Sequence, residues 1–154
     1  MYTLSKYYKL AALLPLALTA VSGIILSVTH DGSNYKSEWS TDDGFVLTVF
    51  LIILFSFIVA MLSLTIFLNN RLAIRNNTFF SFLSWIVLAG SACVFVIYQE
   101  VLNFTGYSDI DGVYEGNRLL DGYIMSVAII HIAGLITTFL HFNASYESIE
   151  EKRS

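Results

Sequence analysis

The chain has 154 residues, of which 56% are hydrophobic and 13% are charged. Soluble domains carry roughly 25% charged residues, so this composition excludes an ordinary water-soluble domain and indicates a protein that lies in lipid. The net charge of −4, with few and scattered basic residues, offers no surface for nucleic acid. The single cysteine, Cys93, excludes an internal disulfide and paired-thiol redox chemistry.

The apolar residues are gathered in four blocks, at about 10–28, 45–68, 79–102 and 123–142. Each block has about the 20 residues that cross a hydrocarbon core about 30 Å thick. Because backbone polar groups in lipid must be bonded within their own segment, each block is predicted to be an α-helix. We therefore predict an all-α fold, an integral membrane four-helix antiparallel bundle in which residues 1–154 form a single domain.

The first block follows Lys6 and Lys9, as the apolar region of a secretory signal peptide would. We expect a membrane span instead, because the apolar sequence continues to Val28, beyond the roughly 7 to 15 residues of a signal. Pro15 lies inside this block, and we expect it to bend the helix and to free a backbone carbonyl that a neighbouring helix must satisfy.

The second block has few polar residues among large aliphatic ones, namely Ser56, Ser63 and Thr65. We therefore expect the second helix to be the one most exposed to lipid. The short connection 69–78 predicts an antiparallel hairpin between the second and third helices, and Asn77 or Thr78 is suited to cap the third helix.

Small and hydroxyl-bearing residues form stripes at helical spacing on the other three blocks, and such residues let helix backbones approach each other in lipid. The stripes are Thr19, Ser22, Gly23 and Ser27 in the first block, Ser81, Ser84, Leu88 and Ser91 in the third, and Val127, His131, Gly134, Thr138 and His141 in the fourth. We predict that these stripes face the interior of one bundle.

Most basic residues lie before the first block, in the 69–78 connection or at the end of the chain: Lys6, Lys9, Arg71, Arg75, Lys152 and Arg153. The two other connections are acidic. Since basic residues are retained on the cytoplasmic side, we predict that both termini are cytoplasmic, in a bacterial inner membrane or a plasma membrane.

His131 is an ionisable residue in the middle of an apolar block, and such a residue is a candidate functional group by default. Glu100 lies within about 7 Å of His131 in depth, and three further polar residues, Ser27, Tyr98 and Gln99, lie at intermediate depths. These five residues can form a ligand-binding or proton-coupling site, or they can simply hydrogen-bond one helix to another. We favour interhelical hydrogen bonding, with Glu100 exposed at the membrane interface as the remaining interpretation.

No cofactor is expected from the sequence. His131 and His141 are separated by about 15 Å along one helix and have no histidine at matching depth, so a haem with two histidine ligands is not indicated. Asp109, Asp111 and Glu115 in the last outer connection are oxygen donors that suit calcium, but the EF-hand spacing is absent and a solvated acidic loop is the favoured interpretation. No nucleophile, base and orienting group can be assembled from the spacing, so an enzyme is not indicated.

Four spans with both termini inside are the layout of claudin-like proteins, MAPEG enzymes and small multidrug transporters, but their marks are missing. The first outer connection has Trp39 without a cysteine pair, and the first block has no charge between Lys9 and Asp31. The layout is also similar to that of the immunity proteins that protect the inner membrane against pore-forming bacteriocins, which are small helical bundles without catalytic residues.

We predict a small non-enzymatic membrane protein that acts through protein–protein binding, with contacts from the outer connections and the inward stripes. It would be an accessory subunit of a membrane complex or a toxin-neutralising, immunity-type partner. One alternative is a small homo-oligomeric transporter or channel with a polar site near Glu100 and His131. The other is a membrane enzyme with a pocket around His131.

Overall fold

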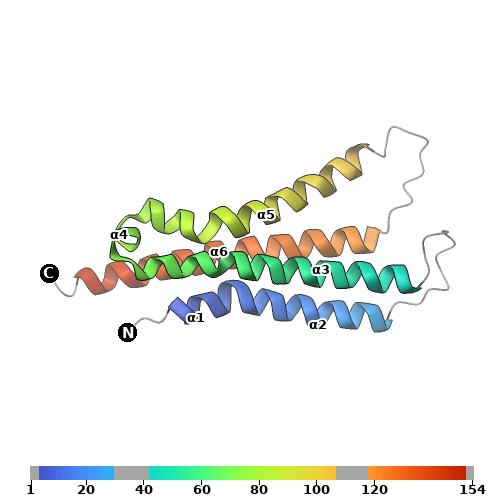
Figure 1. Cartoon of the computed structure of the whole chain (residues 1–154), viewed down its shortest axis with the longest axis horizontal. Coiled ribbons are helices and arrows are strands. Elements are labelled where there is room, and N and C mark those ends of the chain that lie inside the picture. The colour runs from blue at the N-terminus through green and yellow to red at the C-terminus, as the bar shows by residue number, and fades with distance from the viewer. Residues whose placement is uncertain (1–3, 30–41, 107–117, 152–154) are drawn as a thin grey trace.

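The computed structural model describes residues 4–29, 42–106 and 118–151, and no strand occurs in these ranges. Four spans lie side by side, and successive spans run in opposite directions (Figure 1). The first consists of α1 (Leu4–Tyr8), the π-helix η1 (Lys9–Leu13) and α2 (Leu14–Thr29), and the second of α3 (Asp42–Leu62) and the 3₁₀-helix η3 (Ser63–Asn70). After the short α4 (Leu72–Arg75), the third span is α5 (Thr78–Gly106) and the fourth is α6 (Arg118–Glu151).

Each span contains a segment long and apolar enough to cross a membrane: Leu4–Val28, Val46–Asn70, Thr78–Leu102 and Leu120–Ser145. The all-α bundle of four candidate transmembrane helices is thus confirmed, and the chain is an integral membrane protein in a lipid bilayer. The end of the bundle that holds α4, the start of α1 and the end of α6 is here named the hairpin end (Figure 1). The opposite end, where α2 and α5 finish, is the loop end.

The first helix begins at Leu4, earlier than the apolar block predicted. Leu4 and Tyr7 are buried while Lys6 and Lys9 are exposed, so this turn is amphipathic and does not read as part of an apolar run. Asn77 caps α5 as predicted, since its Oδ1 accepts the backbone N–H groups of the next helical turn at 3.1 and 3.2 Å.

The prediction that the second helix is the most exposed to lipid is wrong. Its most apolar segment is 39% buried, against 28% for the first and fourth spans and 33% for the third. The second span packs against all three others, because its few polar residues fall on the buried face: Ser56, Ser63 and Asn69 have no exposed surface. Position, and not the number of polar residues, decides which face of a helix is buried.

Pro15 has no N–H, so the carbonyl four residues earlier, that of Ala11, loses its usual helical partner. The chain widens into η1 just before the proline, and Gly134 of α6 packs directly against this carbonyl. A Cβ on Gly134 would lie 3.3 Å from the Ala11 oxygen, closer than most real contacts. The proline and the glycine therefore allow a close approach of two backbones, as small residues do at helix contacts in lipid.

The core is divided into two clusters that differ in composition. The cluster toward the hairpin end draws buried residues from all four spans and includes an aromatic group, Tyr7, Trp85, Phe139 and Phe142. The cluster toward the loop end consists of Val49, Ile52, Leu120 and Val127 with partly buried neighbours, all from α2, α3 and α6. No described residue of α5 belongs to the second cluster, and α5 leans away from the bundle toward the loop end (Figure 1).

Candidate functional site

His131 lies on α6 in the interior of the bundle, with no exposed surface. Its Nε2 is 2.6 Å from the hydroxyl oxygen of Ser56 on α3, which is also fully buried. The Ser56 hydroxyl in turn lies 3.4 Å from the hydroxyl of Thr19 on α2, and Thr19 donates to the Pro15 carbonyl at 2.9 Å. We call Thr19, Ser56 and His131 the histidine cluster; it joins three of the four spans.

The three members of the histidine cluster lie at the same depth. Counted from the loop end of each span, they are nine, ten and eleven residues in, which is about 14–17 Å of helix. The hydrocarbon core is about 30 Å thick, so the cluster lies close to its middle. A polar group there has no water to bond, which favours hydrogen bonds between helices.

The Ser56 hydroxyl has one proton and two acceptors, so the tautomer of His131 follows from where that proton points. If Ser56 donates to Nε2, Nδ1 carries the ring proton. If Ser56 donates to Thr19, the ring N–H is on Nε2 and points at the serine. In both cases Nδ1 is buried and has no hydrogen-bond partner among the described residues.

A serine hydroxyl within 2.6 Å of an imidazole nitrogen is the distance at which a base activates a nucleophile. Catalysis also needs a group that orients the base and space for a substrate. Neither Ser56 nor His131 has any exposed surface, and the described partner of the ring is the serine alone. The arrangement therefore serves best as a hydrogen bond between α3 and α6.

Tyr123 makes a second polar contact between α6 and α2, nearer the loop end. Its hydroxyl donates to the Thr19 carbonyl at 2.5 Å and lies 3.1 Å from the Ser22 hydroxyl. Gly23 leaves room for this ring, since a Cβ there would lie 2.9 Å from the Tyr123 oxygen. The stripe predicted on the first block faces the interior in part, since Thr19 and Gly23 are buried while Ser22 is exposed. The stripe predicted on the third block does not face the interior throughout, because Leu88 and Ser91 are exposed.

A third polar group lies near the hairpin end and involves Asn69, which the sequence had assigned to the connection. Asn69 is fully buried in η3, and its amide donates to the Ser84 hydroxyl at 2.6 Å and to the Ile66 carbonyl at 3.0 Å. Ser81 donates to the Asn69 side-chain oxygen at 2.6 Å. We call Asn69, Ser81 and Ser84 the asparagine cluster; it fastens η3 to α5.

The other candidates predicted with His131 lie elsewhere. Ser27 donates to the Gly23 carbonyl of its own helix at 2.9 Å, and Tyr98 and Gln99 are exposed on α5. Glu100 is partly buried near the loop end, where the like charge of Asp121 on α6 repels it. None of these four residues is a hydrogen-bond partner of His131.

Metal ligands do not gather in the described part of the chain, where no group of three His, Cys, Asp or Glu side chains occurs. The candidate calcium ligands Asp109, Asp111 and Glu115 lie outside the described residues. His141 is exposed near the hairpin end, with its ring centroid 5.8 Å from that of Tyr7.

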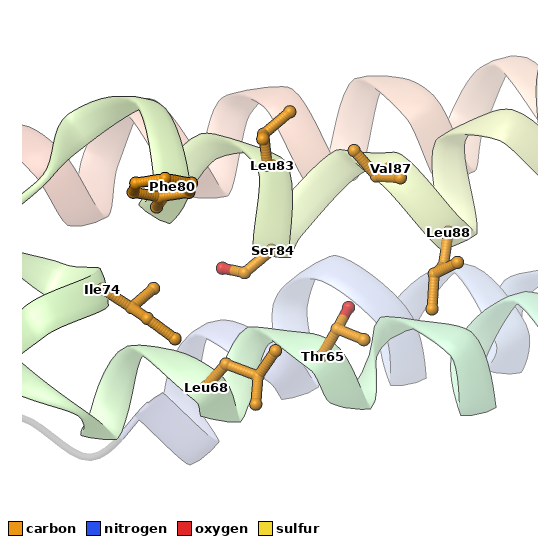
Figure 2. Close-up of a pocket in the computed structure, with 8 residues that line it drawn as sticks. All are labelled: Thr65, Leu68, Ile74, Phe80, Leu83, Ser84, Val87 and Leu88. Carbon is orange, nitrogen blue, oxygen red and sulfur yellow. The ribbon is translucent and has the colours of Figure 1, made fainter.

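An open groove of about 350 Å³ lies between η3 and α5 near the hairpin end. Figure 2 shows its walls: Thr65 and Leu68 on one side face Ser84 and Leu88 on the other, and Ile74 lies toward α4. The groove is lined almost entirely by apolar atoms and does not include the histidine cluster.

Sequence reasoning missed Ser56, Thr19 and Asn69 as partners. The signal that could have identified Ser56 and Thr19 is depth, because both lie as far from the loop end of their spans as His131 does. Comparison of the chain with protein-family models, with curated proteins and with solved structures finds no match, so the geometry alone carries the functional argument.

Proposed function

We propose that this chain is a non-enzymatic membrane protein that works by binding another membrane protein, as an accessory subunit of a complex or as an immunity-type partner that neutralises a toxin. The observation that carries the proposal is the short Ser56–His131 hydrogen bond inside a closed core. His131, the intramembrane residue best suited to a chemical role, serves instead to hold α6 against α3. Function is then left to the surface of the bundle.

A transporter or channel is the competing proposal, and it requires polar groups along a water-filled path. That path would have to join Glu100 and His131, but His131 is hydrogen-bonded to Ser56, and Glu100 lies near the like charge of Asp121. The groove between η3 and α5 is apolar and belongs to neither residue. An enzyme with a pocket around His131 is disfavoured by the same complete burial.

The loop-end half of α5 is the surface that we propose for the partner. It contributes nothing to the loop-end core, and Phe95 and Tyr98 are 61% and 57% exposed. Ser91, Phe95, Tyr98 and Leu102 follow one another at steps of four, three and four residues, the spacing of a seam that packs on a second helix. A partner helix that packs on this seam would cover the apolar side chains that α5 exposes near the loop end.

The sidedness of the protein also remains a proposal, with both termini in the cytoplasm of a bacterial inner membrane or plasma membrane. The basic side chains that the structure describes, Lys6, Lys9, Arg71 and Arg75, lie toward the hairpin end. Acidic residues lie at both ends: Asp42, Asp43, Glu100 and Asp121 toward the loop end, and Glu147, Glu150 and Glu151 where α6 finishes at the hairpin end. The positive-inside rule counts basic residues and gives acidic ones little weight. The positive-inside rule then puts the hairpin end in the cytoplasm.

Photocrosslinking in native membranes tests the partner surface. A benzophenone amino acid replaces Phe95 on α5 or, as control, Val21 on α2, which is 57% exposed and equally far from the loop end of its span. The proposal expects a discrete adduct with a different protein at position 95, lost when Ser91→Phe obstructs the seam, and lipid adducts at position 21. Adducts with lipid alone at position 95 would contradict the proposal, and adducts with a second copy of this chain would favour the transporter.

A further inference from the structure

The groove between η3 and α5 is a second surface feature, and nothing in the proposed function uses it. Eight residues line it: Thr65, Leu68, Ile74, Phe80, Leu83, Ser84, Val87 and Leu88 (Figure 2). From Phe80 to Leu88 it extends about 12 Å along α5. Since half of the hydrocarbon core is about 15 Å thick, the groove runs through most of one leaflet, beginning near the hairpin end.

The walls of the groove present hydrocarbon to whatever occupies it. Its two hydroxyl groups donate to backbone carbonyls: Ser84 to that of Ser81 at 2.7 Å, and Thr65 to that of Leu62 at 3.1 Å. Asn69 behind the wall fixes Ser84 by donating to its oxygen at 2.6 Å. Hydrogen bonds through Asn69 thus fix η3 relative to α5, and the lining of the groove between them favours an apolar occupant.

Two arginines flank the hairpin end of the groove. The backbone N–H of Arg71 bonds the carbonyl of Leu68 at 3.0 Å, and Arg75 follows Ile74 directly; Leu68 and Ile74 both line the groove. Both arginines lie on the short segment around α4, at the level where headgroups begin. The end of α6, with Glu147, Glu150 and Glu151, also lies at the hairpin end of the bundle. Arg71 and Arg75 are nevertheless the charged residues next to the lining of the groove, and they bring positive charge to its mouth.

We propose that the groove binds one acyl chain of an anionic phospholipid, whose headgroup lies at Arg71 and Arg75. Basic pockets between transmembrane helices recognise anionic headgroups by this combination of charge and hydrocarbon contact. A helix 10–12 Å across and 12 Å long fills roughly 900–1,400 Å³, so a groove of about 350 Å³ fits a lipid chain better than a partner helix. The groove ends at Leu88, one helical turn before Ser91, where the proposed partner surface on α5 begins.

Native mass spectrometry of the delipidated protein in mild detergent tests this site. Phosphatidylglycerol and phosphatidylcholine with identical acyl chains are titrated, and the affinity of the first bound lipid is compared. Two arginines at the headgroup level favour the anionic lipid by roughly ten- to thirtyfold. The double variant Arg71→Gln, Arg75→Gln loses this preference, whereas Lys6→Gln, Lys9→Gln, which removes two charges from the same end of the bundle, retains it.

The apolar part of the site has its own pair of variants. Leu88→Trp fills the groove from its α5 wall and is expected to weaken the first binding event of both lipids at least fivefold. Leu18→Trp on α2 adds the same ring at a position that is 53% exposed, against 48% for Leu88, and leaves binding unchanged. Since Leu88 is partly exposed, the variant should fold; Val87→Trp replaces it if the helical circular dichroism is lost.

Three results would overturn the assignment. If the arginine and lysine double variants lost the preference for anionic lipid equally, the preference would follow from net charge and not from a site. If Leu88→Trp and Leu18→Trp changed lipid binding equally, the bound lipid would lie anywhere around the bundle and not in the groove. A dimer in wild-type protein that Leu88→Trp separates would make a second copy of this chain the occupant.

Discussion

The hairpin half and the loop half of this bundle are built by different means. In the hairpin half all four spans meet, Trp85 is fully buried in a cluster of aromatic rings, and the asparagine cluster ties η3 to α5. In the loop half three spans share a small aliphatic core, and Tyr123 bonds α6 to α2. The remaining helix, α5, leans away from the bundle there, and Phe95, Tyr98 and Leu102 are exposed.

This difference indicates that one half of the bundle provides stability and the other half provides the surface for a partner. Lipid tails are as apolar as leucine, so helices associate in a membrane through close packing and hydrogen bonds and not through the hydrophobic effect. In the hairpin half all four spans pack together and hydrogen bonds join η3 to α5, whereas α5 contributes no described side chain to the loop-end core cluster. We infer that the hairpin half holds the fold together and that the loop half of α5 is available to a partner.

The largest effect should come from Trp85. Its ring contacts those of Tyr7, Phe139 and Phe142 at centroid distances of 5.6 to 6.1 Å, and it has no exposed surface. Trp85→Ala should lower the free energy of unfolding by about 3–5 kcal/mol, because a large buried ring leaves a cavity. Phe95→Ala, in the exposed part of the same helix, should change it little; the measurement is unfolding by SDS followed by circular dichroism. Equal losses would abolish the distinction between the two halves.

Gly23 tests the packing of the loop half. A Cβ there would lie 2.9 to 3.1 Å from side-chain atoms of Tyr123, Val49 and Ile53, so these side chains must move. Gly23→Ala should cost about 1–3 kcal/mol of stability by overpacking. Gly122→Ala is the matched control, since nothing lies within 4 Å of its added Cβ, and it should be neutral or slightly stabilising. If both variants were neutral, the loop-half core would be looser than the structure indicates.

The histidine cluster lies between the two halves, and a double-mutant cycle measures what it contributes. His131→Leu and Ser56→Ala should each destabilise the protein, with a coupling energy of about 0.6–1.7 kcal/mol, the range for hydrogen bonds between transmembrane helices. A ligand or proton site would instead give variants of normal stability that lose activity. A coupling energy of zero would remove the structural role assigned to the 2.6 Å contact.

The sidedness of the two ends of the bundle can be tested by their accessibility to a reagent outside the cell. In a Cys93→Ser background, Asn76→Cys at the hairpin end should be protected from a membrane-impermeant maleimide in intact cells and labelled after lysis. Ser108→Cys, in the connection between α5 and α6, should be labelled in both preparations. The reverse pattern would invert the proposed sidedness.

The sequence by itself determined the four spans, their alternating directions and the cap at Asn77. These follow from length, apolarity and the need to bond the backbone within each segment, all of which are local properties. It also gave the depth of every polar residue, because depth depends only on the rise along a helix. It missed the turn from Leu4 to Tyr8, where the exposed Ser5 and Lys6 lie between the buried Leu4 and Tyr7 and interrupt the apolar run.

Only the tertiary structure decided which polar residues meet. A cluster of His131 with Glu100 was possible from their depths, but His131 bonds Ser56, because the rotation of a helix and the choice of its neighbours depend on packing across the whole bundle. The same reason makes the second span the most buried one and puts Asn69 between η3 and α5. The position of a residue within its own helix determines its depth in the membrane, whereas the packing between helices determines which side chains it contacts.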